Sequence, residues 1–518
     1  MRGLKRARRL AAGLLLAGAM TACASLPENM PRSESHALTP DGATRIGRAL
    51  ATRQPAAAGD NHFRPLPDGV DALMARIALA ASAERTLDLQ YYIWHDDLTG
   101  RFLTQALLRA ADRGVRVRVL LDDVGTSGDD QVLSAIDAHP NIEIRLFNPV
   151  ASRGVRGLGM LFDFERTNRR MHNKAFVADN QVAILGGRNI GDEYFGASPE
   201  LAFGDLDVLT FGPVVPQVSH AFDRYWNTPA SIPIAALSGT GTAEDLADVR
   251  VELDRFTLEH RDSPYADLAR EALEAAVGAP GSQLFPGQAH LLYDDPGKIT
   301  RAPEDTEGTL MPQFAGVGVE SSKELLVVSP YFIPGNAGVG FFAELVKRGV
   351  RVTILTNSLA ASDVGAVHSG YQRYRDALLD AGVQLYELRP TARVQTGKKK
   401  MLGSSRASLH AKTFVFDRRS VFIGSLNLDP RSLQLNTEIG IVCDSPPMAD
   451  AIASGIEGEL DALAWQVVQA PTPGGGTQLE WIERRPEGKL RLTEEPEVST
   501  LRRLGVWFLG LLPIESQL

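Results

Sequence analysis

The sequence predicts an α/β fold that consists of two tandem units related by an internal duplication. Two similar strings support this prediction, HNKAFVADNQVAILGGRN at residues 172–189 and HAKTFVFDRRSVFIGSLN at residues 410–427. Two more pairs of segments repeat, LDLQYYIW with VVSPYFIP and RGVRVRVLLDD with RGVRVTILTNS. The second member of each pair follows the first by 235 to 240 residues. Such a nearly constant offset is typical of an internal repeat.

Each unit is expected to begin with a strand, a helix and a second strand. In the first unit the apolar run 87–94 precedes a segment, 102–110, in which apolar side chains recur at helical spacing. Gly114 suits the position just after that helix, and 115–121 is predicted to be the next strand. The second unit repeats this order. Strands that alternate with helices indicate a layered α/β/α arrangement with a mixed, largely parallel sheet.

Composition divides the chain into six segments. A stretch rich in proline, serine and glycine is predicted to be a flexible tether, and an acid-rich helical segment is predicted to connect the two units. Pro471–Gly476 is predicted to link the second unit to an extension. The boundaries are 1–22 for a signal segment, 23–64 for the tether, 65–239 for the first unit, 240–280 for the connector, 281–470 for the second unit and 471–518 for the extension.

The N-terminus has the features of an export signal. Five basic residues precede an apolar run at 10–20 that is too short to span a bilayer. The run ends in MTAC at 20–23, which resembles the lipobox of bacterial lipoproteins. We therefore expect an exported lipoprotein, anchored through Cys23 on the periplasmic side of a bacterial envelope membrane. The alternative is a plain signal peptide with an incidental cysteine. Because Cys443 is the other cysteine in the chain, no internal disulfide is expected.

The C-terminal extension ends in an apolar segment, LRRLGVWFLGLL at 501–512. It is too short to span a bilayer and begins with two arginines after its first residue, which favours a helix in the membrane interface with Trp507 and Phe508 at headgroup depth. The alternative is a terminal helix docked on the protein's own core. The formal net charge of −9 argues against a protein coated with nucleic acid.

The repeated string brings together groups that suit a phosphate. In a strand, residues two apart share a face, so His172 and Lys174 point the same way, as do His410 and Lys412. The glycines that follow, such as Gly424, allow a return strand to approach closely. An asparagine comes off the end of each return strand. Each half therefore presents an imidazole, an ammonium and a carboxamide together.

The paired pattern resembles that of the phospholipase D superfamily, whose members join two half-sites into one phosphodiester-transfer centre between units packed as a pseudo-twofold pair. The resemblance implies that one histidine forms a phosphohistidine while the other acts as acid and base. It favours His172 as nucleophile and His410 as acid/base, although the two strings are too alike to fix that order. The chemistry needs no metal or other cofactor. The predicted catalytic residues are His172, Lys174, Asp179, His410, Lys412 and Asp417, and the predicted phosphate-binding amides are Asn189 and Asn427.

Two kinds of carboxylate accompany these residues. Asp205 and Glu438 begin the apolar strand after each asparagine, and by position they resemble the family's histidine-orienting carboxylates. Asp179 and Asp417 lie seven residues after each histidine and so point to the opposite strand face. For this second pair a structural role near the turn is expected, with a direct chemical role as the alternative.

A polar stretch and two basic loops lie near the motifs but outside the repeated pattern. The stretch His95-Asp96-Asp97 has the residue types of a metal site, but polar loop residues at the edge of the site are expected. Two basic loops precede the motifs and are interpreted as a positive rim that attracts anionic headgroups or nucleic-acid phosphates. The loop residues are Arg153, Arg156, Arg166, Arg169 and Arg170 before the first motif, and Arg389, Arg393, Lys398, Lys399, Lys400 and Arg406 before the second.

Longer strings point to a narrower group. RRMHNKAFVADNQVAILGGRNIGDEYF, SLHAKTFVFDRRSVFIGSLNLDPRS and LNTEIG resemble the bacterial cardiolipin synthases of the C type, over roughly residues 65–518. The resemblance implies transfer of a phosphatidyl group from phosphatidylethanolamine to phosphatidylglycerol, with anionic and zwitterionic phospholipids and a membrane surface as partners and no nucleic acid. This chain lacks the two N-terminal membrane helices of the commoner cardiolipin synthases. A phospholipase D hydrolase, a secreted nuclease and a non-enzymatic lipid-binding scaffold are the alternatives.

Overall fold

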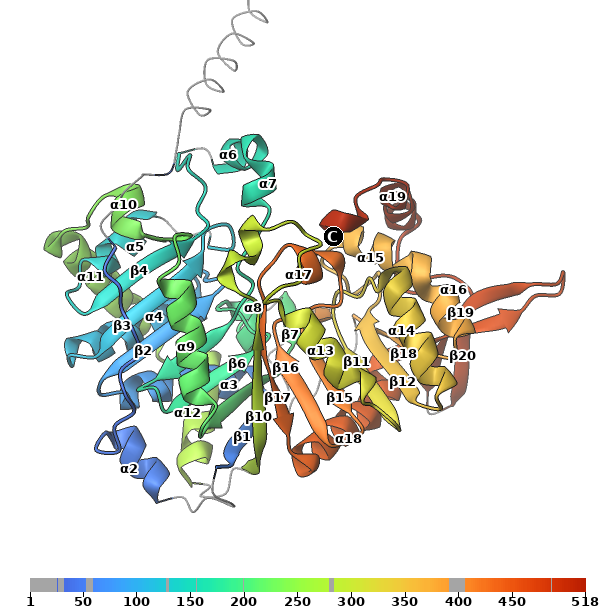
Figure 1. Cartoon of the computed structure of the whole chain (residues 1–518), viewed down its shortest axis with the longest axis horizontal. Coiled ribbons are helices and arrows are strands. Elements are labelled where there is room, and N and C mark those ends of the chain that lie inside the picture. Colours follow the sequence, from blue (N-terminus) through green and yellow to red (C-terminus); the bar gives the residue numbers. More distant parts are fainter. Residues whose placement is uncertain are drawn as a thin grey trace, which may run out of the picture.

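A computed structural model describes residues 26, 32–52, 59–126, 130–154, 156–198, 200–278, 284–390, 406–485 and 487–518. It shows two α/β units side by side (Figure 1). The signal segment, Cys23 and most of the second basic loop (391–405) lie outside the described residues.

The first unit is built on a mixed sheet of eight strands. Its centre is parallel, β2–β3–β4, and strands on both sides run antiparallel to this centre. The spatial order is β9–β4–β3–β2–β5–β6–β8–β1. The strands are β1 (Asn61–Leu66), β2 (Thr86–Tyr91), β3 (Arg116–Asp122), β4 (Ile142–Phe147), β5 (Ala175–Ala178), β6 (Val182–Gly186), β8 (Asp207–Phe211) and β9 (Ser231–Pro233).

The second unit repeats this order with two strands added at its outer edge. The parallel centre is β11–β12–β13, and the full order is β10–β17–β16–β15–β11–β12–β13–β18–β19–β20. The strands are β10 (Phe285–Tyr293), β11 (Glu324–Val328), β12 (Arg351–Asn357), β13 (Gln384–Leu388), β15 (Thr413–Phe416), β16 (Ser420–Gly424), β17 (Ile439–Asp444), β18 (Ala464–Pro471), β19 (Thr477–Arg485) and β20 (Gly488–Leu492).

The two sheets are joined at their inner edges. Strand β1 pairs antiparallel with β10, so the strands form one continuous sheet. A second link is made by β7 (Leu201–Gly204) and β14 (Arg406–Leu409), which pair in parallel although they come from different units. One buried apolar cluster contains side chains from both sheets, including Phe63 and Cys443. The duplicated units therefore share a core, and Cys443 is a free, buried side chain within it.

Helices cover both faces of each half. In the first half α3 and α4 pack on one face and α9 on the other, and in the second half α13 and α14 lie opposite α18. The helices of the first half and the connector are α2 (Arg45–Ala51), α3 (Gly69–Ser82), α4 (Leu98–Asp112), α5 (Asp130–Asp137), α6 (Arg156–Phe162), α7 (Phe164–Thr167), α8 (Asp192–Phe195), α9 (Val215–Trp226), α10 (Ile234–Ser238), α11 (Ala243–His260) and α12 (Pro264–Gly278). Those of the second half are α13 (Leu310–Val319), α14 (Gly335–Lys347), α15 (Gly365–Tyr371), α16 (Arg375–Asp380), α17 (Pro430–Gln434), α18 (Pro446–Leu463) and α19 (Thr500–Gly510), with 3₁₀ turns η1 (Pro296–Thr300), η2 (Gln372–Tyr374) and η3 (Glu515–Gln517).

Two predicted boundaries differ from the structure. Part of the expected tether 23–64 packs on the first unit, because the backbone carbonyl of Ser35 accepts a hydrogen bond from the buried Arg118 at 2.7 Å, and the unit's first strand already starts at Asn61. Pro471–Gly476 is not a linker. It is the turn between β18 and β19, where Gly475 and Gly476 adopt positive φ values that favour glycine.

Candidate active site

The two motif histidines lie just before equivalent strands, β5 and β15, and each is held by the other half. The backbone N–H of His172 donates to the carbonyl of Thr437 at 2.9 Å, and that of His410 donates to the carbonyl of Gly204 at 2.8 Å. Both side chains are buried. The half-sites are thus interlocked through their backbones as well as through the shared core.

The histidine side chains are crossed in the same way. Nδ1 of His172 lies 2.9 Å from Oε2 of Glu438, and Nδ1 of His410 lies 2.7 Å from Oδ2 of Asp205. Each imidazole from one unit is therefore paired with a carboxylate from the other. A carboxylate at Nδ1 keeps the proton there and leaves Nε2 with its lone pair, as a nucleophile or general base requires.

The residue that directly follows the motif glycine, Gly186 or Gly424, contacts the carboxylate differently in the two halves. A Cβ on Gly187 would lie 2.2 Å from Oδ1 of Asp205, so the glycine is needed for the carboxylate to reach its place. The equivalent position in the second half is Ser425, whose hydroxyl donates a hydrogen bond to Glu438. The two carboxylates consequently have different surroundings, although the motifs are nearly the same.

The motif lysines lie beside their own histidines. Nζ of Lys174 donates to the carbonyl of His172 at 2.6 Å, and Nζ of Lys412 donates to the carbonyl of His410 at 2.5 Å. Burial lowers the pKa of Lys412 to about 8 and that of Lys174 well below its ordinary value, while the nearby carboxylates of Asp205 and Glu438 act in the opposite direction. Two buried ammonium groups in one site favour the binding of an anion.

Both imidazoles are difficult to protonate in this environment. Burial lowers the pKa of His172 to about 4 and that of His410 to about 3, and each lysine charge acts on the imidazole of the other half as well as on its own. This mutual effect places all four groups in one electrostatic site. At neutral pH both imidazoles are neutral until an anion binds.

The predicted asparagines are buried at the site but have different partners. Asn189 donates from Nδ2 to the hydroxyl of Tyr194 at 2.9 Å and accepts from the backbone N–H of Ile93 at 3.2 Å. Oδ1 of Asn427 is buried without a hydrogen-bond partner among the described residues. Asn427 therefore has the freer amide of the two.

Asp179 and Asp417 occupy the hairpin turns that follow β5 and β15. The carboxylate of Asp179 accepts hydrogen bonds from the backbone N–H groups of Glu84, Arg85 and Thr86 at the start of β2. Asp417 does the same at the start of β11. Both residues also have a positive φ, which aspartate tolerates better than most residues. These contacts give the pair a role in strand geometry at a distance from the imidazoles.

Replacing Asp179 by alanine is expected to lower the free energy of unfolding by about 1–3 kcal/mol, because three backbone N–H groups lose their acceptor. Turnover by the folded fraction should remain. Urea denaturation and a parallel activity assay would test this, with Asp179→Asn as the matched control because it keeps one acceptor oxygen. A variant as stable as the parent but inactive would restore the chemical role.

Aromatic side chains that do not belong to the two motifs line the site. The ring centroid of Tyr92 lies 5.2 Å from that of His172, and Tyr194 and Phe203 lie 5.1 and 5.0 Å from His410. Tyr92 lies in the segment YYIW that was singled out as a repeat, so its position after β2 was the available signal. These rings surround the imidazoles with low-dielectric material, which strengthens electrostatic interactions there.

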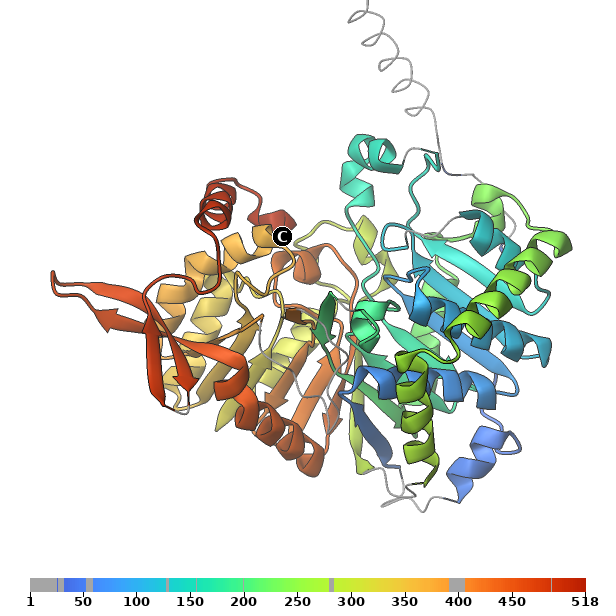
Figure 2. The same ribbon diagram turned by 180° about the vertical axis from the view of Figure 1, so that it is seen from behind.

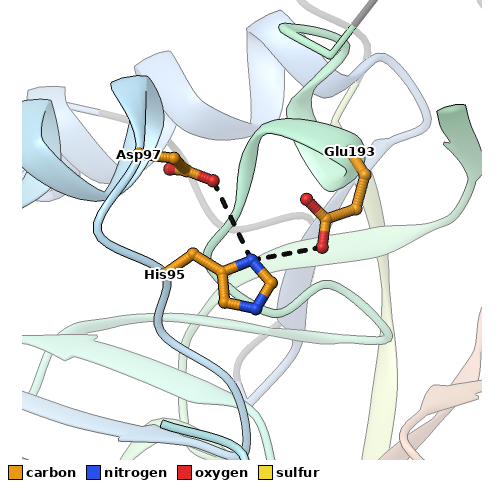
Figure 3. A group of neighbouring side chains, drawn as sticks. All are labelled: His95, Asp97 and Glu193. Atoms are coloured by element: carbon orange, nitrogen blue, oxygen red, sulfur yellow. Dashed lines mark ion pairs between the residues drawn. The ribbon is translucent and has the colours of Figure 1, made fainter. Parts of the chain in front are cut away.

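In the polar stretch after β2, His95 and Asp97 form a cluster with Glu193 and not with Asp96. Nδ1 of His95 lies 3.4 Å from Glu193 and 3.9 Å from Asp97, as Figure 3 shows. Asp96 instead pairs with Arg101. Hydrogen bonding to Glu193 raises the pKa of His95, so the group can act as an ion pair between the β2–α4 loop and α8. Because Glu193 adjoins Tyr194, this pair also positions α8 beside the active site.

The prediction of a positive rim does not hold for the first basic loop. Arg153 and Arg156 form ion pairs with Asp130, and the buried Arg170 lies 3.2 Å from Asp122. These guanidinium groups are neutralised by carboxylates that the linear sequence does not place near them. The loop before His172 therefore contributes to the fold more than to a field that attracts anions.

Comparison with known proteins agrees with this geometry. The family model "Cardiolipin synthase, PLD-like domain" matches residues 77–226 and 319–460. Cardiolipin synthase C of Escherichia coli is 44% identical over 467 residues, which cover 87% of this chain and 95% of that protein. An uncharacterised protein of Helicobacter pylori is 34% identical and covers 78% of this chain and 80% of its own length.

Solved structures support the fold. Phosphatidylserine synthase of Haemophilus influenzae superposes with a TM-score of 0.56 at 13% sequence identity and covers 92% of this chain and 99% of its own. The match extends through both halves, so the paired arrangement is shared. Two domain matches, the high identity over most of the chain and the interlocked histidines lead to one conclusion: the chain belongs to the cardiolipin synthase family of phospholipase D-like enzymes.

Proposed function

We propose that the protein transfers a phosphatidyl group to phosphatidylglycerol and so makes cardiolipin, with phosphatidylethanolamine as donor. The observation that carries the proposal is the crossed pair of imidazoles and carboxylates. It is supported by the 44% identity to cardiolipin synthase C of Escherichia coli. The enzyme class follows from the family, whereas the donor and the acceptor are part of the proposal.

The reaction proceeds in two displacements at phosphorus. His172 attacks through Nε2, the bond to the headgroup oxygen breaks, and His410 donates a proton to that oxygen. The bound phosphodiester is an anion, so it raises the pKa of His410 and lets the imidazole carry this proton. In the second step His410 takes a proton from the hydroxyl of phosphatidylglycerol, whose oxygen attacks the phosphohistidine. Lys174 and Lys412 hold the non-bridging oxygens throughout.

An apolar cavity next to the site supports a lipid rather than a nucleic acid. Its volume is about 430 Å³, and Asp205, Ala411 and Thr413 belong to its lining together with leucines of β12, β13 and α18. Acyl chains need such a surface, and a nuclease does not. The chain also carries both half-sites itself, whereas the secreted-nuclease alternative often assembles them from two copies.

A phospholipase D hydrolase would use the same residues with water as acceptor, and lipid mass spectrometry separates the two reactions. Purified protein is incubated with mixed vesicles of phosphatidylethanolamine and phosphatidylglycerol, each with a labelled headgroup. Cardiolipin with release of ethanolamine is the expected product. Formation of phosphatidic acid without cardiolipin would refute the assignment as a synthase. Release of glycerol instead of ethanolamine would show that phosphatidylglycerol, and not phosphatidylethanolamine, is the donor.

The pH profile is expected to depend on the lysine of the second motif. Above about pH 8 Lys412 loses its proton, so kcat/KM should fall as the site loses a charge that binds phosphate. On the acid side the profile should fall near pH 4, where His172 becomes protonated and cannot attack. In Lys412→Arg the alkaline limb should move to higher pH, since a guanidinium stays charged. An unchanged alkaline limb in that variant would assign it to another group.

We also propose that Cys23 carries a lipid and anchors the enzyme on the periplasmic side of an envelope membrane. The segment after it agrees with such an anchor, because residues from Arg32 onward run along the folded body. In the part of the chain that the structure describes, no helix combines the length and the hydropathy of a membrane span. Cys23→Ala should shift the protein only in part from the membrane fraction, since α19 still binds. Full release after this change would argue against α19 as a membrane contact.

A further inference from the structure

A second apolar surface lies on the loop that leads into the first motif. Four side chains of α6 and α7 are turned to solvent, and none of the residues in α6 is buried. We call them the α6–α7 patch, and the exposed fractions are 36% for Leu158, 69% for Leu161, 61% for Phe162 and 50% for Phe164. Large apolar side chains that gather in this way on a folded protein mark an interaction site.

The C-terminal helix α19 carries a comparable surface. Val506 is buried and packs beside Gly365 of α15, so one face of the helix docks on the protein. The other face stays free. Its exposed apolar residues are Leu501, Leu504, Trp507, Phe508 and Leu511, which we call the α19 patch. One face of the helix thus docks on the protein, as the alternative from the sequence predicted, and the membrane contact of the other face stays a prediction.

Helices α6, α7 and α19 lie on one side of the molecule, above the region where the halves meet, in both views (Figures 1 and 2). The C-terminal residues join them. Nδ2 of Asn168, directly after α7, donates to Oε1 of Gln517 at 2.7 Å, and the backbone N–H of Arg431 donates to the carbonyl of Leu518 at 2.7 Å. Arg431 lies in α17, four residues after the motif Asn427. The C-terminal residues after α19 therefore connect α7 with α17, the helix that follows the motif Asn427.

The cations near the patches are already neutralised. Arg156 pairs with Asp130, Arg166 with Asp163 and Arg503 with Glu494. A partner that binds through charge, such as a nucleic acid, finds few free guanidinium groups here. A partner that buries apolar side chains gains from both patches.

We propose that the α6–α7 patch is a second membrane contact, which inserts into a phospholipid bilayer together with the α19 patch. With contacts on α6–α7 and on α19, which the C-terminal residues connect through α17, the bilayer surface itself presents the phospholipid headgroups to the site. This inference rests on the proposed function for its choice of partner. Binding of vesicles, however, needs no turnover, so the two are tested separately.

The binding test uses the full chain with Cys23→Ala and His172→Ala, which carries no lipid at residue 23 and performs no transfer. Flotation with phosphatidylcholine vesicles is compared for this parent and for the same chain with Leu161→Glu and Phe162→Glu. We expect the partition coefficient to fall on the order of tenfold, at low and at high salt alike, because the contact is apolar. Equal binding by parent and variant would overturn the proposal.

A matched control excludes a general effect of added charge. Val251 and Leu258 of α11 are 69% and 62% exposed, so Val251→Glu with Leu258→Glu adds the same charge to equally exposed positions outside the two patches. This control should bind vesicles as the parent does. A comparable loss of binding in the control would overturn the assignment to α6 and α7.

Two further readouts separate the remaining outcomes. With His172 intact, the Leu161/Phe162 variant should keep its activity toward short-chain phospholipids dispersed below their aggregation concentration, while activity on vesicles falls with binding. Light scattering without lipid should give the same mass for parent and variant. A dimer that the substitutions dissociate would assign the patch to a second copy instead. Loss of binding in the Leu161/Phe162 variant, together with no cardiolipin synthesis by the chain that keeps His172, would uphold the membrane contact and refute the proposed function.

Discussion

His172→Ala and His410→Ala are each expected to lower phosphatidyl transfer by more than about a thousandfold, because nucleophile and acid/base act as one unit. Removal of His172 leaves phosphorus without an attacking atom, and removal of His410 leaves the departing alkoxide without a proton. Rates of cardiolipin formation from labelled vesicles would measure the effect. The double variant should be little worse than either single one.

Acid-quenched labelling of the two variants separates their roles. With a donor labelled at phosphorus, His410→Ala should still accumulate some phosphohistidine, whereas His172→Ala should form none. The opposite result would exchange the two roles while leaving the mechanism intact. Transfer at the parent's rate by either variant would refute the site.

Glu438→Gln is expected to lower transfer by about a hundredfold or more, because the amide no longer fixes the Nδ1 proton of His172 or stabilises the cation that forms. Asp205→Asn should act in the same way on His410. Burial raises the pKa of Glu438, but His172, Lys174 and the hydroxyl of Ser425 hold it below its ordinary value, so this group stays ionised. Steady-state kinetics on dispersed substrate would give the loss, which should fall on kcat.

If Glu438→Gln lost activity because the fold is damaged, the double variant and the melting temperature would show it. Glu438 directly precedes β17 and pairs with His172 of the other half, so its replacement also tests how the halves are joined. Adding Glu438→Gln to His172→Ala should cost almost no further activity, since the carboxylate acts through that imidazole. An equal additional loss in the double variant, or a large drop in melting temperature, would show that Glu438 acts by holding the fold.

Much of the fold was predictable from the sequence. The constant offset between repeats predicted two units with similar sheets, and the strand–helix–strand order located their parallel centres. The contact between the two sheets could not be predicted in this way, since the pairing of β1 with β10 joins segments more than two hundred residues apart. Residues 32–52 lie in a segment that is rich in proline, serine, alanine and glycine and has little periodicity, which predicts a tether, yet buried arginines of the first unit bind the backbone carbonyls of Ser33 and Ser35.

The site shows the same division. Spacing and strand periodicity selected the histidines, lysines and carboxylates, and the opposite-face argument set Asp179 apart from His172. Nothing in the sequence revealed that each carboxylate belongs to the imidazole of the other unit. The sequence also did not reveal which residues join His95: Glu193 comes beside His95 and Asp97 only after α8 folds against the β2–α4 loop, whereas Asp96 pairs with Arg101. The sequence does not show that the first basic loop is neutralised, because Asp130 and Asp122, which pair with Arg153, Arg156 and Arg170, precede them by more than twenty residues.

The crossing of the two halves has a consequence for how the enzyme comes into being. A chain that is still being synthesised contains His172 long before Glu438 has been added and folded. Its imidazole then has no carboxylate to fix the proton, and the ammonium of Lys412 is absent as well. A nascent chain therefore lacks the paired groups of the site. The site is complete only when β17, which directly follows Glu438, has paired with β10, and β10 has paired with β1 of the first sheet. Completion of the fold is therefore the step that makes the site reactive.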